Sequence, residues 1–366
     1  MGTERLTPRQ FMILVILFSI GTAILIIPSA LAAEAKQDAW ILEIVGVGIG
    51  IVLCWLYIYI SKLHPGCTIF QINEKIFGKW LGKCLSLGIA FTTLIFSSQV
   101  LFYVGNFLIT QIMPTTPIEA THILVMVIVI MGAKLGVIVL ARTGEIFFPW
   151  IILLFILFMV VIIPQVQFNF ILPIGEVTVM PVIRGALKIS SYSYMTTFFV
   201  FNVLFNKVAS IQKATKGYIV GALVSGIMMF TFVVTSILVL GPENTAVQAY
   251  PSYALAQRIN IGNVLQRIEV IIAFLWLVSI FFELSLYFYI TLQGIAEVFQ
   301  LKDYKNLCYP IGVIVTVLSF VVYPSTPYQS KWDEQTWIPQ ALLIGVIYPI
   351  LIVSIDQLKK LKVYRA

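Results

Sequence analysis

The chain has 366 residues, of which 60% are hydrophobic and 11% are Asp, Glu, Lys or Arg. Soluble domains carry about 25% charged residues, so this composition excludes a soluble fold and indicates that a lipid bilayer is the solvent. The 23 Lys and Arg residues outnumber the 16 Asp and Glu residues, which gives a net charge of +7. In so hydrophobic a chain this excess indicates membrane topology rather than a nucleic-acid partner.

The cysteine and histidine residues predict no metal site and no cofactor. The four cysteines form no C-x-x-C pair, and no histidine stands near them at zinc-ligand spacing. His64 and His122 each flank an apolar segment, where a solvated imidazole is the expected state. The sequence also lacks the paired carboxylates, metal motifs and phosphate-binding loops of enzymes, so we expect no catalytic activity.

Windows of about 20 apolar residues, the length of a membrane-spanning helix, predict ten transmembrane helices in a single membrane domain over residues 1–366. The predicted spans are residues 11–31, 39–61, 85–112, 123–140, 146–163, 183–205, 218–240, 264–292, 309–323 and 338–355. The sixth span is interrupted by polar and charged residues and the ninth is short. The count of ten therefore depends most on these two spans.

The basic residues predict how these helices are oriented, because Lys and Arg in short loops collect on the cytoplasmic side. Dividing them between alternate loops places seventeen on one side and six on the other. The side with seventeen includes the start of the chain and the short tail at 357–366. Both termini are therefore predicted to be cytoplasmic.

The first span contains features that interrupt a helix. The small residues Gly21, Thr22 and Ala23 lie near its middle, and Pro28 lacks the amide that would bond the carbonyl of Ile24. Two interpretations are open. The segment is either a kink with a small-residue packing face, or a binding site in which exposed backbone amides receive a ligand carboxylate.

The sixth span is interrupted as well, by a polar run that includes Ser190, Ser191, Tyr192 and Ser193. If the ten spans divide into two groups of five, the first and sixth occupy corresponding positions, and the second group enters the membrane from the opposite side. This is the inverted repeat of many secondary transporters, which bind their substrates between the broken helices. Repeat one is predicted to cover about residues 8–165 and repeat two about residues 180–356.

Glu283 is the ionisable residue that stands out inside the apolar segments, because no acid or base lies within four residues of it. It is expected to bind the ammonium group of a ligand, to take up a proton for coupling, or to form a structural hydrogen bond to a broken helix. Glu43 and Glu145 lie near the ends of the second and fifth spans, where interfacial ion pairs are expected.

Five further residues are candidates for the pocket, its gate or its coupling. Gln99 and Tyr103 are four residues apart on one face of the third span, with Tyr103 assigned to the ligand and Gln99 to gating or coupling. Lys188 either snorkels to the interface or contacts the ligand. Arg267 and Glu269 are too close in sequence to pair on one helix, so they either contact other helices at an outer gate or cap their own.

Several motifs in the same order resemble a known family. Residues 19–31, SIGTAILIIPSAL, resemble the first helix of the amino acid, polyamine and organocation transporter superfamily. Within it, the chain is similar to the B subunits of spore germination receptors. Further matches are FGKWLG at residues 77–82, Tyr250-Pro251-Ser252, Arg267-Ile268-Glu269 and Trp276.

The resemblance implies a LeuT-like fold with a pocket between the first and sixth helices, lined also by the third and eighth. It implies that nutrient germinants, small amino acids above all, bind there and that Gly21, Thr22 and Ala23 supply amides for a carboxylate. It further implies an A subunit and a lipoprotein C subunit as partners in the spore inner membrane. The alternative on the same scaffold is an active proton-coupled amino acid transporter.

Overall fold

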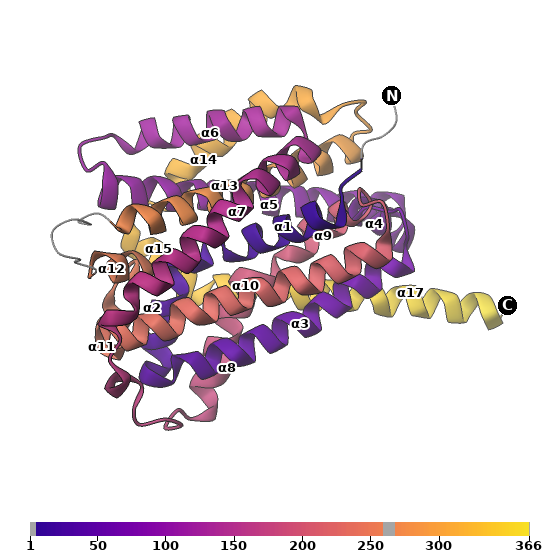
Figure 1. Cartoon of the computed structure of the whole chain (residues 1–366). Helices are drawn as coiled ribbons and strands as arrows, with labels where there is room; N and C mark the ends of the chain where they lie inside the picture. The colour runs from indigo at the N-terminus through magenta and orange to yellow at the C-terminus, as the bar shows by residue number, and fades with distance from the viewer. Residues whose placement is uncertain (1–4, 259–267, 366) are drawn as a thin grey trace.

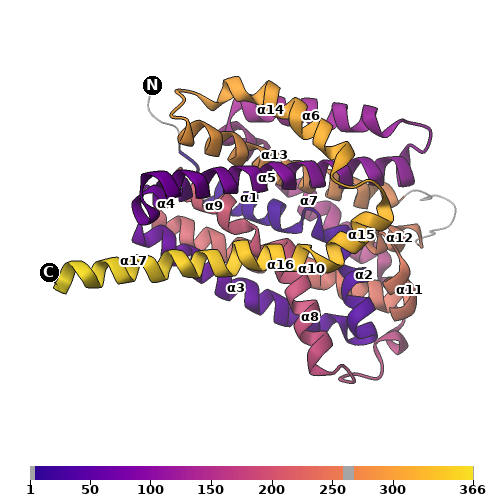
Figure 2. The same ribbon diagram turned by 180° about the vertical axis from the view of Figure 1, so that it is seen from behind.

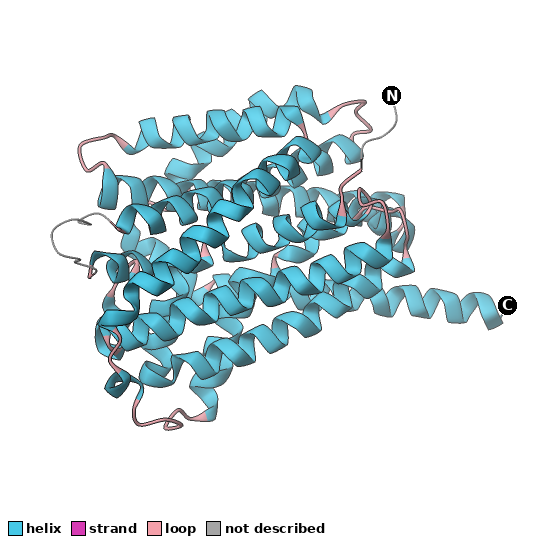
Figure 3. Cartoon of the chain, in the orientation of Figure 1, coloured by secondary structure: helices cyan, strands magenta, loops and turns pink. Residues whose placement is uncertain are grey.

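The structure, a computed structural model, describes residues 5–258 and 268–365, and these parts form helices joined by turns and short loops (Figure 3). The first half contains α1 (Pro8–Ile20), α2 (Ala23–Ala35), α3 (Ala39–Leu63), α4 (Ile69–Phe77), α5 (Lys79–Phe107), α6 (Ile118–Leu135), α7 (Val137–Ile162), α8 (Val179–Ser190) and α9 (Thr197–Phe205). The second half contains α10 (Ile211–Leu240), α11 (Pro242–Val247), α12 (Pro251–Gln257), α13 (Glu269–Val298), α14 (Cys308–Val321), α15 (Thr326–Gln335), α16 (Trp337–Leu342) and α17 (Tyr348–Arg365). Short 3-10 or π-helical segments lie between them: η1 (Lys36–Asp38), η2 (Leu108–Ile112), η3 (Ile163–Gln165), η4 (Phe168–Ile171), η5 (Ser191–Met195), η6 (Tyr304–Leu307) and η7 (Leu343–Ile347).

Eight helical stretches of the described chain are long and apolar enough to cross a membrane. They are Ala23–Leu63, Lys79–Ile112, Ile118–Leu135, Val137–Gln165, Ile211–Leu240, Glu269–Val298, Tyr304–Val321 and Trp337–Leu361. The prediction of an all-α, multi-span membrane protein is therefore confirmed. Neither the first nor the sixth predicted span forms one uninterrupted helix within the described residues, because each is divided into two.

The first predicted span is divided into α1 and α2 at Gly21 and Thr22. Gly21 leaves helical geometry, with ψ at −96°, and α2 starts directly after Thr22. The prediction that Pro28 breaks this helix is wrong, since α2 continues through it. Proline at this position deprives the carbonyl of Ile24 of its helical partner, and the hydroxyl of Ser252 donates a hydrogen bond of 2.5 Å to that carbonyl instead. Pro28 thus creates an anchor for α12.

The sixth predicted span is divided at the polar run that the sequence singles out. α8 ends at Ser190, and a π-helical turn, η5, separates it from α9. The hydroxyl of Ser190 donates to the carbonyl of Gly46 at 2.9 Å, so it fixes the end of α8 against α3. Ser193 lies within the π turn and is fully buried. Turns of this kind occur often at functional sites.

The predicted boundary between the fourth and fifth spans is wrong. The sequence suggests a loop between residues 140 and 146, whereas α6 and α7 are separated at Gly136. Gly136 has a φ of 97°, a left-handed value that glycine adopts without a Cβ clash. The predicted loop therefore belongs to α7, and its Glu145 lies 3.6 Å from Arg9 and accepts a hydrogen bond of 3.0 Å from Gln10.

The long helices run side by side, with α1 and α13 in the middle of the bundle (Figures 1 and 2). One end of the bundle carries the start of α1, α4 and the end of α17, and we call it the α4 end. The opposite end, which we call the α15 end, carries α11, α12 and α15. At the α4 end, α17 projects beyond the other helices (Figures 1 and 2).

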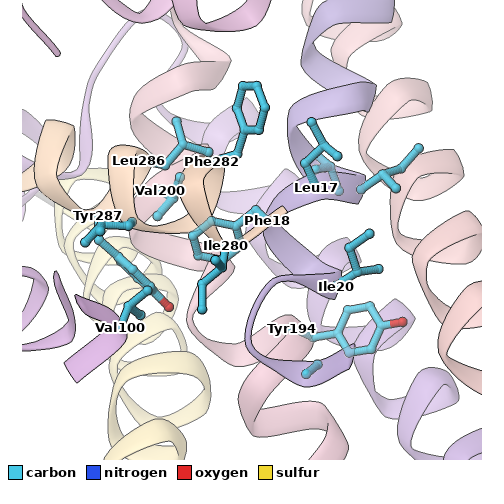
Figure 4. Packing of buried hydrophobic residues seen from close by; sticks show 14 of the residues in the cluster. Leu17, Phe18, Ile20, Val100, Tyr194, Val200, Ile280, Phe282, Leu286 and Tyr287 are labelled. Carbon is cyan, nitrogen blue, oxygen red and sulfur yellow. The ribbon is translucent and has the colours of Figure 1, made fainter. Parts of the chain in front are cut away.

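The core is built around the break between α1 and α2. Phe18, three residues before the break, packs edge-on against Tyr287 of α13 with ring centroids 5.0 Å apart, and against Phe201 of α9 at 5.6 Å. Figure 4 shows Phe18 and Tyr287 among other buried side chains from α1, α5, α9, η5 and α13. The break is therefore held in a rigid, aromatic environment.

α3 packs closely on α8, so we expect Gly46→Ala to destabilise the fold. A Cβ at Gly46 would lie 1.9 Å from Cγ2 of Ile189 and 3.1 Å from the carbonyl oxygen of Ala186. Overpacking of this kind costs about 1–3 kcal/mol, which thermal unfolding in detergent would detect as a lower midpoint. Gly48→Ala is the matched control, because a Cβ there meets nothing within 4 Å in the described chain. Equal unfolding midpoints for the two variants would contradict the prediction.

Candidate functional site

A small cavity, which we call the inner cavity, lies beside the break between α1 and α2. Its lining combines that break with α5, η5, α13, the connection between α14 and α15, and α16. The lining residues are Thr22, Phe96, Gln99, Val100, Tyr103, Tyr192, Glu283, Tyr287, Tyr323 and Trp337. The cavity volume is about 10 Å³, enough for one water molecule, so the structure is closed around this place.

Glu283 is bound to the break itself. It is 4% exposed, and its Oε2 accepts hydrogen bonds from the amide of Thr22 at 2.6 Å and from the hydroxyl of Thr22 at 2.8 Å. The start of α2 carries a partial positive charge, and hydrogen bonds to an ionised carboxylate are strong, so both favour a negative charge there. Of the three roles left open for Glu283, the structural hydrogen bond is present. Binding of a ligand ammonium and uptake of a proton stay predictions.

One wall of the inner cavity is a row of aromatic rings. Tyr287 packs on Phe96 at 5.4 Å, Phe96 on Trp337 at 5.2 Å, and Trp337 stacks on Tyr192 at 4.9 Å. The indole nitrogen of Trp337 donates to Oγ of Ser191 at 3.0 Å. Ser191 therefore positions the wall from behind, while Tyr192 lines the cavity.

Gln99 lies on α5 with its side chain at the same cavity and is 2% exposed. Neither its amide nitrogen nor its amide oxygen has a hydrogen-bond partner among the described residues. Gly21 and Ala23, on either side of Thr22, do not line the cavity. Gly21 packs directly against the Glu283 side chain instead.

A larger cavity, the vestibule, lies toward the α15 end and has a volume of about 640 Å³. Its lining comes from α2, α5, η2, α8, η5, the connection between α10 and α12, and α15. Tyr192 lines both the vestibule and the inner cavity. The two cavities are therefore separated by little more than this side chain and its neighbours.

Asp333 of α15 closes the inner cavity on the vestibule side. The hydroxyl of Tyr103 lies 2.7 Å from both carboxylate oxygens of Asp333, and Tyr323 and Gln329 donate to it at 3.5 Å and 3.4 Å. Burial raises the pKa of Asp333 to about 6, although hydrogen bonds from Tyr103, Gln329, Tyr323 and Tyr192 act in the opposite direction. α15 thus covers the inner cavity on this side, joined to it by the hydrogen bonds from Tyr103 and Tyr323 to Asp333, and we call it the lid.

The lid should therefore respond to pH. An exposed aspartate titrates near 3.9, the value we expect once α15 lifts and Asp333 meets water. The closed state then binds the proton more tightly, so closure is favoured in acid and loses this advantage as the pH rises through about 6. A cysteine introduced by Val100→Cys in the inner cavity reports closure by its rate of reaction with a polar maleimide. After correction for the ionisation of the thiol, this rate should be roughly tenfold lower at pH 5 than at pH 7.

At each pH, the labelling rate of the Val100→Cys protein is divided by that of the Val100→Cys protein that also carries Asp333→Asn. The asparagine does not titrate. This ratio cancels the ionisation of the thiol itself, and protein without Val100→Cys gives the background from the native cysteines. A ratio that is the same at pH 5 and pH 7 would contradict the assignment of Asp333 to the lid.

Apart from Gln99, two of the predicted gating or coupling residues, Lys188 and Glu269, do not line the inner cavity. Lys188 lines the vestibule, and its ammonium lies 2.6 Å from a carboxylate oxygen of Glu34. Glu269 is the first residue of α13. Arg267 lies outside the described residues. The structure therefore brings Thr22, Gln99, Tyr103, Tyr192 and Glu283 together around one cavity, but not Lys188 or Glu269.

Two of the sequence expectations are wrong because neighbouring helices cover the residues concerned. His122 is fully buried rather than solvated, and its Nδ1 lies 2.8 Å from the hydroxyl of Ser319 on α14. Glu43 is fully buried rather than interfacial, and neither of its carboxylate oxygens has a hydrogen-bond partner within the described ranges. α8 and α10 pack over this part of α3 and remove Glu43 from the interface.

Sequence reasoning missed Asp333, Tyr323 and Trp337. A signal for two of them was present, because Gln329, Asp333 and Trp337 are spaced four residues apart within a polar segment of an otherwise apolar chain. Such spacing places side chains on one helical face. No pattern in the sequence indicated that this face covers the broken helices.

The fold is that of LeuT-like transporters. It is similar to Mhp1, a nucleobase-cation-symport-1 family transporter, in a closed conformation with bromovinylhydantoin bound, with a TM-score of 0.70, 11% identity and coverage of 94% of this chain and 78% of that one. It is also similar to MhsT in complex with L-phenylalanine, with a TM-score of 0.58, 13% identity and coverage of 95% and 97%. The chain is therefore an all-α, multi-span membrane protein with a transporter fold.

The sequence identifies the family within this fold. The model of the Spore_permease family, described as spore germination protein, matches residues 5–327. The chain is 26% identical to spore germination protein KB of Bacillus subtilis (strain 168), over 88% of this chain and 86% of that protein. It is 24% identical to spore germination protein YndE of the same organism, over 98% of both chains. The chain belongs to the spore germination protein family, and the predicted family resemblance is confirmed.

Proposed function

We propose that this protein is the germinant-binding membrane subunit of a spore germination receptor, and that it binds a small amino acid or a related nutrient in the inner cavity. The observation that carries the proposal is the position of Glu283, buried at the break between α1 and α2 in a closed cavity that η5 also lines. Family membership supports the link to germination. Ligand binding in this position would be coupled directly to the conformation of the divided helices.

We assign four roles within the site. Thr22, Tyr103, Tyr192 and Glu283 line the cavity and would contact the ligand. Gly21, Ala23 and Ser191 would shape it without direct contact, and Ser190 and Ser193 would permit the π turn. Gln99, Lys188, Arg267 and Glu269 stay candidates for gating or coupling.

We further propose ten spans, arranged as two inverted repeats of five. α3, the seven long apolar helical stretches that follow it and the two divided segments together support this number. α1 starts and α17 ends at the same end of the bundle, as an even number of spans requires (Figures 1 and 2). The predicted placement of seventeen of the 23 basic residues on that side supports a cytoplasmic α4 end.

The proposed setting is the spore inner membrane, with a germination receptor A subunit and a lipoprotein C subunit as partners. The proposal includes no cofactor, no metal, no nucleic acid and no enzymatic step. Two relatives from Bacillus subtilis (strain 168) are named spore germination proteins A2 and B2. These names support the proposal that this protein is one subunit of a germination receptor with several subunits.

The proposal is tested with spores whose copy of this gene carries Glu283→Gln. The variant keeps the shape of the side chain but removes the charge, so germination by a zwitterionic or cationic nutrient should require at least about tenfold more nutrient, since a hydrogen bond to a charged group contributes about 1.5–3 kcal/mol. The parent strain is first tested with all twenty amino acids to choose the nutrient. An immunoblot of the spore membrane controls for protein level. An unchanged dependence on nutrient concentration would overturn the proposal.

An active proton-coupled amino acid transporter is the second candidate, because the solved structures of similar fold include transporters. Uptake of labelled amino acid into vesicles that contain this chain alone distinguishes the two. Accumulation against a gradient would favour the transporter, whereas binding without accumulation would favour the receptor subunit.

A further inference from the structure

The backbone amide at the start of α2 already binds a carboxylate that belongs to the protein. The amide and the hydroxyl of Thr22 both donate to Oε2 of Glu283, at 2.6 Å and 2.8 Å. A helix N-terminus favours an anion, and Glu283 supplies it. There is no space beside Gly21 for a second anion, because even a Cβ at Gly21 would lie 2.1 Å from the same carboxylate oxygen. A ligand carboxylate therefore cannot bind the amide of Thr22, because the carboxylate of Glu283 occupies that position.

The charge of the inner cavity favours a cation. Glu283 is the one carboxylic acid among the described residues that line it, and none of these residues is basic. Its second oxygen, Oε1, accepts no hydrogen bond from the described parts of the chain. Phe96, Tyr287 and Trp337 add aromatic rings, whose faces attract cations. Lys188 is the basic residue among the described residues that line the vestibule, and it is paired with Glu34.

Gln99 provides a second, neutral contact. Its amide is buried at the cavity and both of its polar atoms are without partners among the described residues. A buried amide in this state is costly, and a ligand that offers both a donor and an acceptor removes the cost. A carboxamide offers both, whereas a carboxylate offers acceptors alone and would meet the negative charge of Glu283.

We propose that the inner cavity recognises small organic monocations, with a ligand ammonium on Oε1 of Glu283 and a neutral hydrogen-bonding group, such as a carboxamide, on Gln99. This inference rests on the proposed function, since it concerns the same cavity, and it narrows the ligand class. The ammonium group is required and a free carboxylate is not. An amino acid amide should therefore bind more tightly than the amino acid itself.

The test measures binding of three related compounds to the purified full-length protein in lipid nanodiscs at pH 7. L-alaninamide carries the ammonium and the carboxamide, L-alanine carries the ammonium and a carboxylate, and propionamide carries the carboxamide alone. Binding is followed by calorimetry. We expect L-alaninamide to bind at least tenfold more tightly than L-alanine, and propionamide to show no binding.

Two variants identify the contacts. Glu283→Gln should weaken L-alaninamide at least tenfold, and Gln99→Leu should weaken L-alaninamide more than L-alanine. Gln212→Leu, an exposed glutamine at the start of α10, is the matched control and should bind all three compounds like the parent. Thermal unfolding of each variant shows whether it is folded.

The outcomes separate this inference from the proposed function. If L-alanine binds as tightly as L-alaninamide or more tightly, the inference is overturned, while the germinant site in the inner cavity stands. The same holds if propionamide binds like L-alaninamide. If none of the three compounds and none of the twenty amino acids binds, both the inference and the proposed function fail.

Discussion

Gly21→Ala should reduce the sensitivity of spores to their nutrient by about a hundredfold. A Cβ at this position would lie 2.1 Å from Oε2 of Glu283 and 3.0 Å from its Cβ and Cδ. The carboxylate does not retreat freely, because two hydrogen bonds hold it to Thr22. A hydrogen bond to a charged group contributes at least about 1.5 kcal/mol, so losing both costs about 3 kcal/mol or more. This free energy corresponds to a change of roughly a hundredfold in the nutrient concentration required.

The effect of Gly21→Ala is expected from the lack of space beside Glu283. The φ of Gly21 is −40°, outside the left-handed region that favours glycine. Gly88→Ala on α5 is the matched control, because a Cβ there meets nothing within 4 Å among the described residues. The measurement is the decrease in optical density of spore suspensions over a range of nutrient concentrations. Equal sensitivity of the Gly21 and Gly88 variants would contradict the prediction.

The parts of the fold that follow from local chemistry could be predicted from the sequence. Long apolar runs predict the continuous helices, and Gly21 and the serines of η5 predict where two helices are divided. Pro28 shows the limit of such reasoning. Its missing amide was recognised, but the remedy, a hydroxyl from Ser252, comes from a residue 228 positions away from Ile24 and depends on the packing of α12.

The candidate site was predictable to a smaller extent, because its charges are defined by partners on other helices. The isolation of Glu283 within its apolar segment marked it as functional, yet the sequence alone left its partner open. Asp333 was missed since it lies in a short polar helix, where an acidic residue is ordinary. The role of Asp333 depends on its hydrogen bond with Tyr103, which lies 230 positions away in the chain. A single sequence does not show that these two residues are in contact.

Tyr103→Phe should open the lid over the inner cavity. The phenol hydroxyl of Tyr103 provides the shortest hydrogen bonds to Asp333, at 2.7 Å, and phenylalanine keeps the ring while removing them. The buried carboxylate then loses about 1.5–3 kcal/mol of stabilisation in the closed state. The open population should increase by roughly ten- to a hundredfold, which is measured as faster maleimide labelling of Val100→Cys at pH 7.

Tyr323→Phe is the matched control, because Tyr323 donates to the same carboxylate over 3.5 Å, a length at which a hydrogen bond is weak. If hydrogen bonds from the tyrosines to Asp333 hold α15 in place, losing the shorter bond should open the lid more. Tyr103→Phe should then be labelled at least about five times faster than Tyr323→Phe. If both variants label at the rate of the parent, the tyrosines do not hold the lid and closure depends on apolar packing of α15. Adding Asp333→Asn to Tyr103→Phe distinguishes these cases further, because a neutral side chain without its donor costs less to bury than a charged one, and the lid should close again in part.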